Sequence, residues 1–300
     1  MKAKGQGKAH AKVIVIGEHA VVYGHPGIAI PFIPLTVQIE VEVSDGDMLT
    51  APFFKGFMEQ LPDELLFLLA HVNALREVLK FPRVHIQIHI DIPTSAGLGS
   101  SAAITSALTV ALYDWMEVPL APGERFEWTQ KSEKMVHGNP SGIDALMVQS
   151  MTPFWFAKGK QPKSISMNLK GSFVIIDSGV AGKTKQAVAN VAGLYMKNIA
   201  QVHLESIGLM VPLLEEAIMQ NDENDLARLM NQTHYHLKEL NLTHEKVEWI
   251  IEESLKRGAT GAKITGGGLG GSVLLYVPLS NDAKAIQSYF ESHHLKVWVM

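Results

Sequence analysis

The stretch 93–103, PTSAGLGSSAA, consists mostly of small residues. Glycine lets the backbone approach a ligand closely, and the N–H groups at the start of a helix attract anions, most often phosphate. The alternative is an ordinary tight turn in which Ser100 and Ser101 only cap a helix, because serine is common at that position. A Walker loop is absent, since no lysine follows the second glycine. The stretch indicates an anion site without deciding it.

A lysine, a glutamate and a histidine bracket an apolar run near the start of the chain. Lys12 precedes the run VIVI, and Glu18 and His19 follow it. A strand over 13–16 would therefore carry these side chains at its two ends. His19 taken alone is more typical of a hydrogen-bonded histidine with a structural role. It is the combination with the other stretches that points to a site.

Two carboxylates flank a bend in the middle of the chain. Glu133 and Asp144 lie on either side of NPSG, residues 139–142, whose composition favours a turn. Each has an ordinary alternative, Glu133 as a solvated helix residue and Asp144 as the N-cap of the following helix. Together they are potentially catalytic carboxylates.

Alternating strands and helices must position these residues. Apolar and polar residues alternate over 84–92, which predicts a half-buried strand, and residues 102–116 have the apolar spacing of a helix. The small residues between them are therefore expected to form a strand-to-helix turn. Further strands are expected over 13–16, 37–43, 173–176, 261–265 and 272–277, and further helices over 62–79, from 124, and over 184–200, 203–220, 222–238, 243–257 and 281–292. The pattern breaks over 151–170, which predicts one domain over 1–165, a second over 166–300, and an α+β arrangement.

Composition excludes several classes of function. The chain has 300 residues, of which 47% are hydrophobic and 19% charged, as in a soluble globular protein. A net charge of -4 without long basic runs argues against a nucleic-acid partner, and no apolar run is long enough to predict a membrane span. No cysteine is present, which removes thiol catalysis and fits a cytoplasmic location. The 13 histidines lack the spacing of a metal site beside a suitable acid.

Three motifs, in order and at suitable spacing, resemble those of the GHMP kinases, the family of galactokinase, homoserine kinase, mevalonate kinase and phosphomevalonate kinase. They are KVIVIGEHAVVYG at 12–24, PTSAGLGSSAA at 93–103 and KITGGGLGGS at 263–272, with HGNPSGID at 137–144 as a further match. The resemblance spans nearly the whole chain. The stretches at 12–24 and 137–144 are most similar to the mevalonate-phosphorylating members. Leu269 interrupts the third glycine run, and its Cβ restricts the backbone if a positive φ is needed there.

The resemblance implies ATP-dependent phosphorylation of mevalonate with Mg²⁺. Asp144 would be the base that takes the proton of the substrate hydroxyl, and Lys12 its electrostatic partner beside the transferring phosphate. Glu133 with Ser100 or Ser101 would hold Mg²⁺, an ion that prefers oxygen ligands. The residues expected around the nucleotide are Pro93, Ser95, Ala96, Gly97, Leu98, Gly99, Ser100, Ser101 and Ala102, and those expected around mevalonate are Lys12, Glu18, His19, Asp144 and Thr184.

The implied fold is a two-layer α+β structure in two domains. The N-terminal domain would resemble the second domain of ribosomal protein S5 and the C-terminal domain would be ferredoxin-like, and the family also suggests a homodimer. Another small-alcohol kinase, for phosphomevalonate or homoserine, is the alternative within the family. A non-catalytic ligand sensor on the same fold is a second alternative, which the joint presence of Lys12, Glu133 and Asp144 disfavours.

Overall fold

The chain divides into two compact units, each built from segments that are discontinuous in sequence. The computed structural model describes residues 1–93, 96–138 and 140–300. The first unit comprises Met1–Ala11, Leu35–Ile92 and Gly99–Ser150, and the second comprises Lys12–Pro34, Pro93–Leu98 and Met151–Met300. Strands β1 (Lys4–Ile16) and β2 (Gly27–Val43) pass from one unit into the other. The domain boundary expected at residue 165 stays a prediction.

The first unit contains a mixed sheet whose buried face follows the alternation of the sequence. Strand β5 (Val84–Ile90) runs antiparallel to residues 37–43 of β2, β3 (Met48–Ala51) runs parallel to β5, and β4 (Phe54–Phe57) closes a hairpin with β3. Val84, Ile86 and Ile88 of β5 are buried, as expected for side chains on one face of a half-buried strand.

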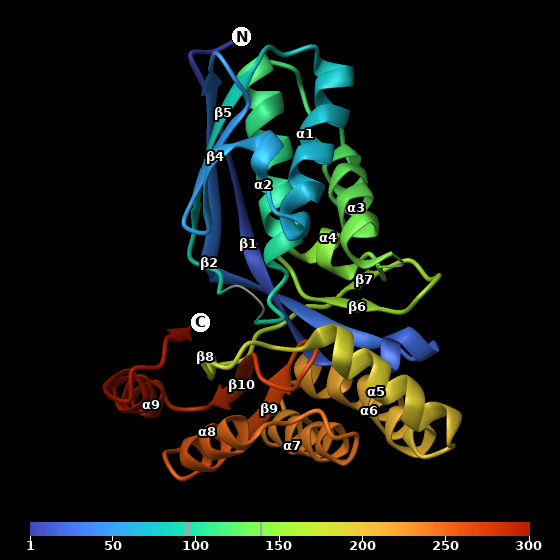
Figure 1. Ribbon diagram of the computed structural model, residues 1–300. Helices are drawn as coiled ribbons and strands as arrows, with labels where there is room; N and C mark the ends of the chain where they lie inside the picture. Colours follow the sequence, from blue (N-terminus) through green and yellow to red (C-terminus); the bar gives the residue numbers. More distant parts are fainter. Residues whose placement is uncertain (94–95, 139) are drawn as a thin grey trace. The chain divides into compact units, whose positions relative to one another are not determined.

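Three helices of the first unit lie side by side next to this sheet (Figure 1). They are α1 (Leu66–Leu79), α2 (Ser100–Met116) and α3 (Glu124–His137), and the short α4 (Ile143–Met147) packs on α2 and α3. The alanine-rich α2 is buried nearly all round, which is typical of a central helix. The turn of small residues is therefore followed by the core helix of the unit.

The second unit contains an antiparallel sheet in the order β11 (Val297–Val299), β8 (Ser172–Asp177), β10 (Ser272–Val277) and β9 (Gly261–Thr265). Helices α7 (Glu223–Glu239), α8 (Glu245–Leu255) and α9 (Ser280–Ser292) pack on the sheet, α6 (Ala200–Gln220) packs on α7, and α5 (Thr184–Met196) packs on α6 (Figure 1). Every residue of β9 and β10 is buried, and β9 includes one charged side chain, that of Lys263.

The predicted elements are confirmed in type, and several boundaries are wrong. Strand β1 begins at Lys4 rather than residue 13, because small and polar residues such as Gly5 and Gly7 hide its first half from an apolar pattern. Strand β2 begins at Gly27 rather than residue 37, because Pro31 and Pro34 break the strand pattern of the sequence although the strand itself is continuous. The irregular stretch 151–170 contains β6 (Phe154–Phe156), which pairs with residues 27–29 of β2, and β7 (Lys163–Ser164), which pairs with β6. No helix of the described residues is long and apolar enough to span a membrane.

Candidate active site

The start of α2 presents backbone N–H groups that no carbonyl within the helix accepts. Gly99, with φ of 76°, precedes the helix, and the N–H of Ala103 donates to the Gly99 carbonyl at 2.9 Å. The N–H groups of Ser100, Ser101 and Ala102 therefore precede the first helical hydrogen bond, and the helix dipole favours an anion beside them. Because Gly99 is the cap residue, Ser100 and Ser101 are not N-caps, and the simple capping interpretation is wrong.

A serine and a glutamate meet beside this helix start. The Ser101 hydroxyl donates to Glu133 Oε1 at 2.7 Å, so α3 delivers a carboxylate to the first turn of α2. Glu133 is only 1% exposed, which makes the solvated-helix interpretation of this residue wrong. A buried carboxylate needs compensation by hydrogen bonds or by positive charge. A hydroxyl and a carboxylate oxygen in contact are the donor types that Mg²⁺ takes.

The first half of the small-residue turn, in the second unit, rests directly on the third glycine motif. A Cβ built on Gly97 would lie 2.8 Å from the Gly266 Cα, and a Cβ built on Gly266 would lie 2.6 Å from the Gly97 Cα. Both residues have positive φ, 78° and 86°. Only glycine satisfies both conditions, so two motifs far apart in sequence are matched through their backbones. The N–H of Lys12 donates to the Leu98 carbonyl at 3.1 Å and ties β1 to the same turn.

Leu269 has the positive φ that would restrict a residue with a Cβ at this position. Its φ is 59°, in the left-handed region, and its N–H donates to the Leu242 carbonyl at 2.7 Å. The glycines at 266, 268, 270 and 271 also have positive φ. Leu269 thus adopts the left-handed backbone conformation of the neighbouring glycines, and the hydrogen bond to Leu242 stabilises it there.

Two of the residues expected around mevalonate converge on Gly267. His19 Nε2 lies 2.9 Å from the Gly267 carbonyl, and because a carbonyl only accepts, this nitrogen carries the proton. Burial lowers the pKa of His19, which keeps the ring neutral. Thr184, exposed at the start of α5, lies so close that a Cβ on Gly267 would be 2.4 Å from its Oγ1. The third glycine motif therefore brings His19 and Thr184 together.

Glu18 is paired with a lysine that the sequence did not single out. Lys263 Nζ, on β9, donates to Glu18 Oε1 and to the Ile264 carbonyl at 2.7 Å, and neither side chain of the ion pair is exposed. Within the described residues Glu18 Oε2 has no hydrogen-bond partner. Burial raises the pKa of Glu18 against the opposing charge of Lys263, and burial lowers the pKa of Lys263. The sequence of β9 has one lysine in a strand that is otherwise apolar or small, which indicates that Lys263 needs a buried partner but does not say which residue that is.

Asp144 is the second residue of α4. Gly142, with φ of 88°, is the cap of this helix, so the N-cap interpretation of Asp144 is wrong. The side chain is half-buried. Lys12, which is buried, belongs to the second unit and Asp144 to the first, so their pairing stays a prediction.

The other predicted nucleotide residues lie in or beside the turn. Ala96, Leu98 and Ala102 are buried, and Pro93 is half-buried. Ser95 lies outside the described residues.

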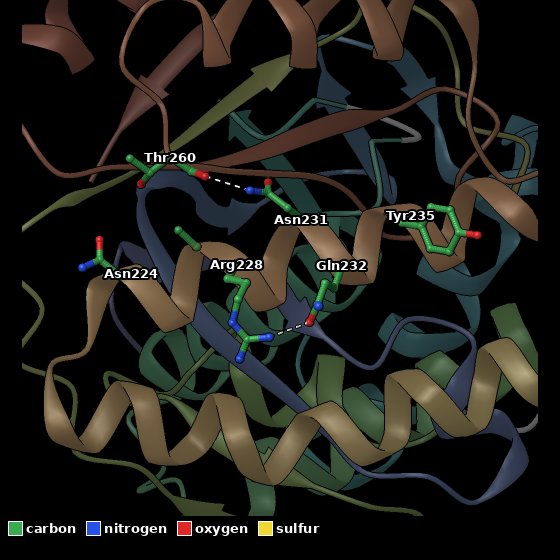
Figure 2. Close-up of a pocket in the computed structure, with 7 residues that line it drawn as sticks. Asn224, Arg228, Asn231, Gln232, Tyr235 and Thr260 are labelled. Carbon is green, nitrogen blue, oxygen red and sulfur yellow. Dashed lines mark hydrogen bonds between the residues drawn. The ribbon is translucent and has the colours of Figure 1, made fainter.

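A hollow of about 490 Å³ lies elsewhere in the second unit, over α7 (Figure 2). Its lining includes Arg228, Asn231 and Thr260 and none of the predicted site residues. The Asn231 amide donates to the Thr260 carbonyl at 2.8 Å (Figure 2). It also accepts from the N–H of Ala262 at 2.8 Å, so it completes the hydrogen bonding at the edge of β9. Arg228 is paired with Asp225. Asn231 and Arg228 thus have structural partners.

Sequence and structure comparisons match the same proteins along nearly the whole chain. Residues 67–151 match the family described as GHMP kinases N terminal domain, and residues 214–296 match GHMP kinases C terminal. A mevalonate kinase of Pyrococcus abyssi is 31% identical over 299 residues, covering 90% of this chain and 88% of the relative. The structure of a mevalonate kinase from methicillin-resistant Staphylococcus aureus is 30% identical, covers 100% of this chain and 99% of that chain, and has a TM-score of 0.78. The Methanococcus jannaschii mevalonate kinase is 25% identical, covers 98% of this chain and 96% of that chain, and has a TM-score of 0.83.

Proposed function

This chain belongs to the GHMP kinase family, and we propose that it transfers the γ-phosphoryl group of ATP to the primary hydroxyl of mevalonate. The observation that carries the type of reaction is the contact of Ser101 with the buried Glu133 at the N-terminus of α2. Phosphoryl transfer needs positioning and charge compensation more than covalent help, and this arrangement offers both. The choice of mevalonate is supported by the relatives, which are mevalonate kinases and which align with this chain over most of their length.

Backbone groups of the small-residue turn bind the phosphates in this proposal. The N–H groups of Ser100, Ser101 and Ala102 donate to phosphate oxygens, and the packing of Gly97 on Gly266 keeps the turn in place. Glu133 and Ser101, whose oxygens are in contact, would hold Mg²⁺. When bound, the ion neutralises charge on the phosphates of ATP.

Asp144 and Lys12 act on the acceptor in the proposed reaction. Asp144 takes the proton of the primary hydroxyl, the hydroxyl oxygen forms its bond to the γ-phosphorus, and the bond from phosphorus to the ADP oxygen breaks. Lys12 keeps Asp144 ionised and compensates the charge that develops on the transferring group. Mevalonate itself is held by His19 and Thr184, which converge on Gly267.

Contact of Glu18 with mevalonate stays a prediction, and the ion pair with Lys263 fixes the position of its side chain. Its side chain is buried with Lys263, and the neighbouring His19 provides the group that faces the third glycine motif. The expected homodimer and cytoplasmic location remain predictions from the sequence.

Replacing Glu133 by Gln should raise the Mg²⁺ concentration that gives half-maximal rate by at least about tenfold, because one anionic oxygen ligand is lost. The measurement is the rate of ADP release with mevalonate and ATP across a Mg²⁺ titration. Glu127→Gln, an exposed change on the same helix, is the matched control and should leave the titration unchanged. A folded Glu133→Gln protein with normal Mg²⁺ dependence would remove this residue from the proposed metal site.

A further inference from the structure

A fully buried histidine connects the three helices of the first unit. His71 lies on α1, its Nδ1 is 2.6 Å from the Ser132 hydroxyl on α3, and its Nε2 is 3.0 Å from the Thr109 hydroxyl on α2. The ring also packs edge-on against Trp128 of α3, with centroids 6.2 Å apart. His71, Ser132 and Thr109 are at most 1% exposed. This cluster has no access to substrate, and neither the sequence motifs nor the proposed reaction uses it.

The hydrogen bonds of this cluster fix the direction of every donor. Thr109 donates its hydroxyl proton to the Thr105 carbonyl at 2.9 Å, so toward His71 it can only accept. His71 Nε2 therefore carries the ring proton and donates it to Thr109. Burial lowers the pKa of His71 to about 3, so the ring is neutral, Nδ1 is an acceptor, and Ser132 donates to it. Every polar atom of the three side chains in these contacts is satisfied.

The two helices that His71 joins to α1 also carry the proposed metal ligands. Thr109 bonds to the Thr105 carbonyl, and the Thr105 hydroxyl donates to the Ser101 carbonyl at 3.1 Å, so two side-chain bonds within α2 lie between the contact with His71 and the first turn of the helix. At the other end, Ser132 is the residue immediately before Glu133 on α3. The two residues in contact at the helix start, Ser101 and Glu133, thus belong to the two helices that His71 ties together (Figure 1).

We propose that His71 is a positioning residue that holds α3 against α2, so that Glu133 stays within reach of Ser101 and of the metal ion. Side chains that orient metal ligands without touching the metal typically change affinity by roughly ten- to a hundredfold when they are removed. A neutral imidazole suits this task because it donates at one nitrogen and accepts at the other, and so joins two hydroxyls on different helices. The inference rests on the proposed function, because it needs Glu133 to be a metal ligand.

The test compares metal binding by His71→Ala with that by Leu75→Ala. Leu75 is also fully buried on α1, so its truncation opens a comparable space without removing a hydrogen bond to α2 or α3. Binding of Mn²⁺ in the presence of ATP and without any acceptor is followed by electron paramagnetic resonance. We expect about tenfold weaker Mn²⁺ binding for His71→Ala and little change for Leu75→Ala. Equal binding by the two variants would overturn the proposal.

A second variant covers the case in which His71→Ala does not fold. Thr109→Val keeps the shape of the side chain and removes both the acceptor for His71 and the bond to Thr105, so it should also weaken Mn²⁺ binding severalfold, and normal binding would overturn the proposal. Because the readout needs no acceptor, it is independent of the substrate. Absence of mevalonate turnover in the unaltered protein would contradict the proposed function, whereas equal Mn²⁺ binding contradicts only the role of His71.

Discussion

Asp144→Asn should lower kcat with mevalonate by at least about a hundredfold, with little change in the KM for ATP. Asparagine keeps the size of the side chain and much of its hydrogen bonding, but it cannot accept a proton at neutral pH. General-base assistance is worth roughly a hundred- to ten-thousandfold, and the nucleotide is held mainly by the turn at the start of α2. Steady-state kinetics with ATP and mevalonate varied separately measure both effects.

Lys12→Met tests whether the lysine assists the proton transfer to Asp144. Its kcat should fall by a comparable factor, and the double variant with Asp144→Asn should lose much less than the product of the two factors, because residues that act as a unit are not additive. Near-normal kcat for Asp144→Asn would mean that the hydroxyl loses its proton elsewhere. A raised KM for mevalonate at unchanged kcat would make Asp144 a binding residue.

Lys263→Met should cause the largest loss of stability among single changes in the site. It leaves the carboxylate of Glu18 buried without its cation, and breaking a buried ion pair from one side costs roughly 3–5 kcal/mol. The urea midpoint of unfolding should fall accordingly. Lys256→Met is the control, because it removes the exposed pair with Glu253 and should cost no more than about 1 kcal/mol.

The double variant Lys263→Met with Glu18→Gln separates loss of charge pairing from loss of packing. Removing the carboxylate's charge together with its partner should restore most of the lost midpoint, since no uncompensated ion remains in the interior. If the double variant is less stable than Lys263→Met alone, pairing with Glu18 is not what Lys263 contributes.

The strand–turn–helix around the phosphate site could be predicted because local patterns determine it. Residues 84–92 alternate, the glycines permit positive φ, and the apolar spacing after Ser101 is helical, so β5, the turn and α2 follow from neighbouring residues. The two-domain α+β fold of GHMP kinases was likewise predictable, because the motifs that resemble the family cover nearly the whole chain.

Partners that are distant in sequence could not be predicted. Nothing near Glu18 indicates that its partner is Lys263, since the pairing depends on how β9 lies against the end of β1. His71 lies in an ordinary amphipathic helix pattern, and its two hydroxyl partners come from α2 and α3. The short strands β6, β7 and β11 were not predicted either, because two or three residues are too few to show a periodic pattern.

The substrate is the central claim, and a comparison of acceptors tests it most directly. With Mg²⁺ and ATP in excess, ADP release is measured against mevalonate, phosphomevalonate, homoserine and galactose, and kcat/KM is determined for each. We predict the highest value for mevalonate, by a wide margin. A higher kcat/KM for phosphomevalonate or homoserine would contradict the assignment within the family, and ATP binding without turnover of any acceptor would make the chain a sensor instead of a kinase.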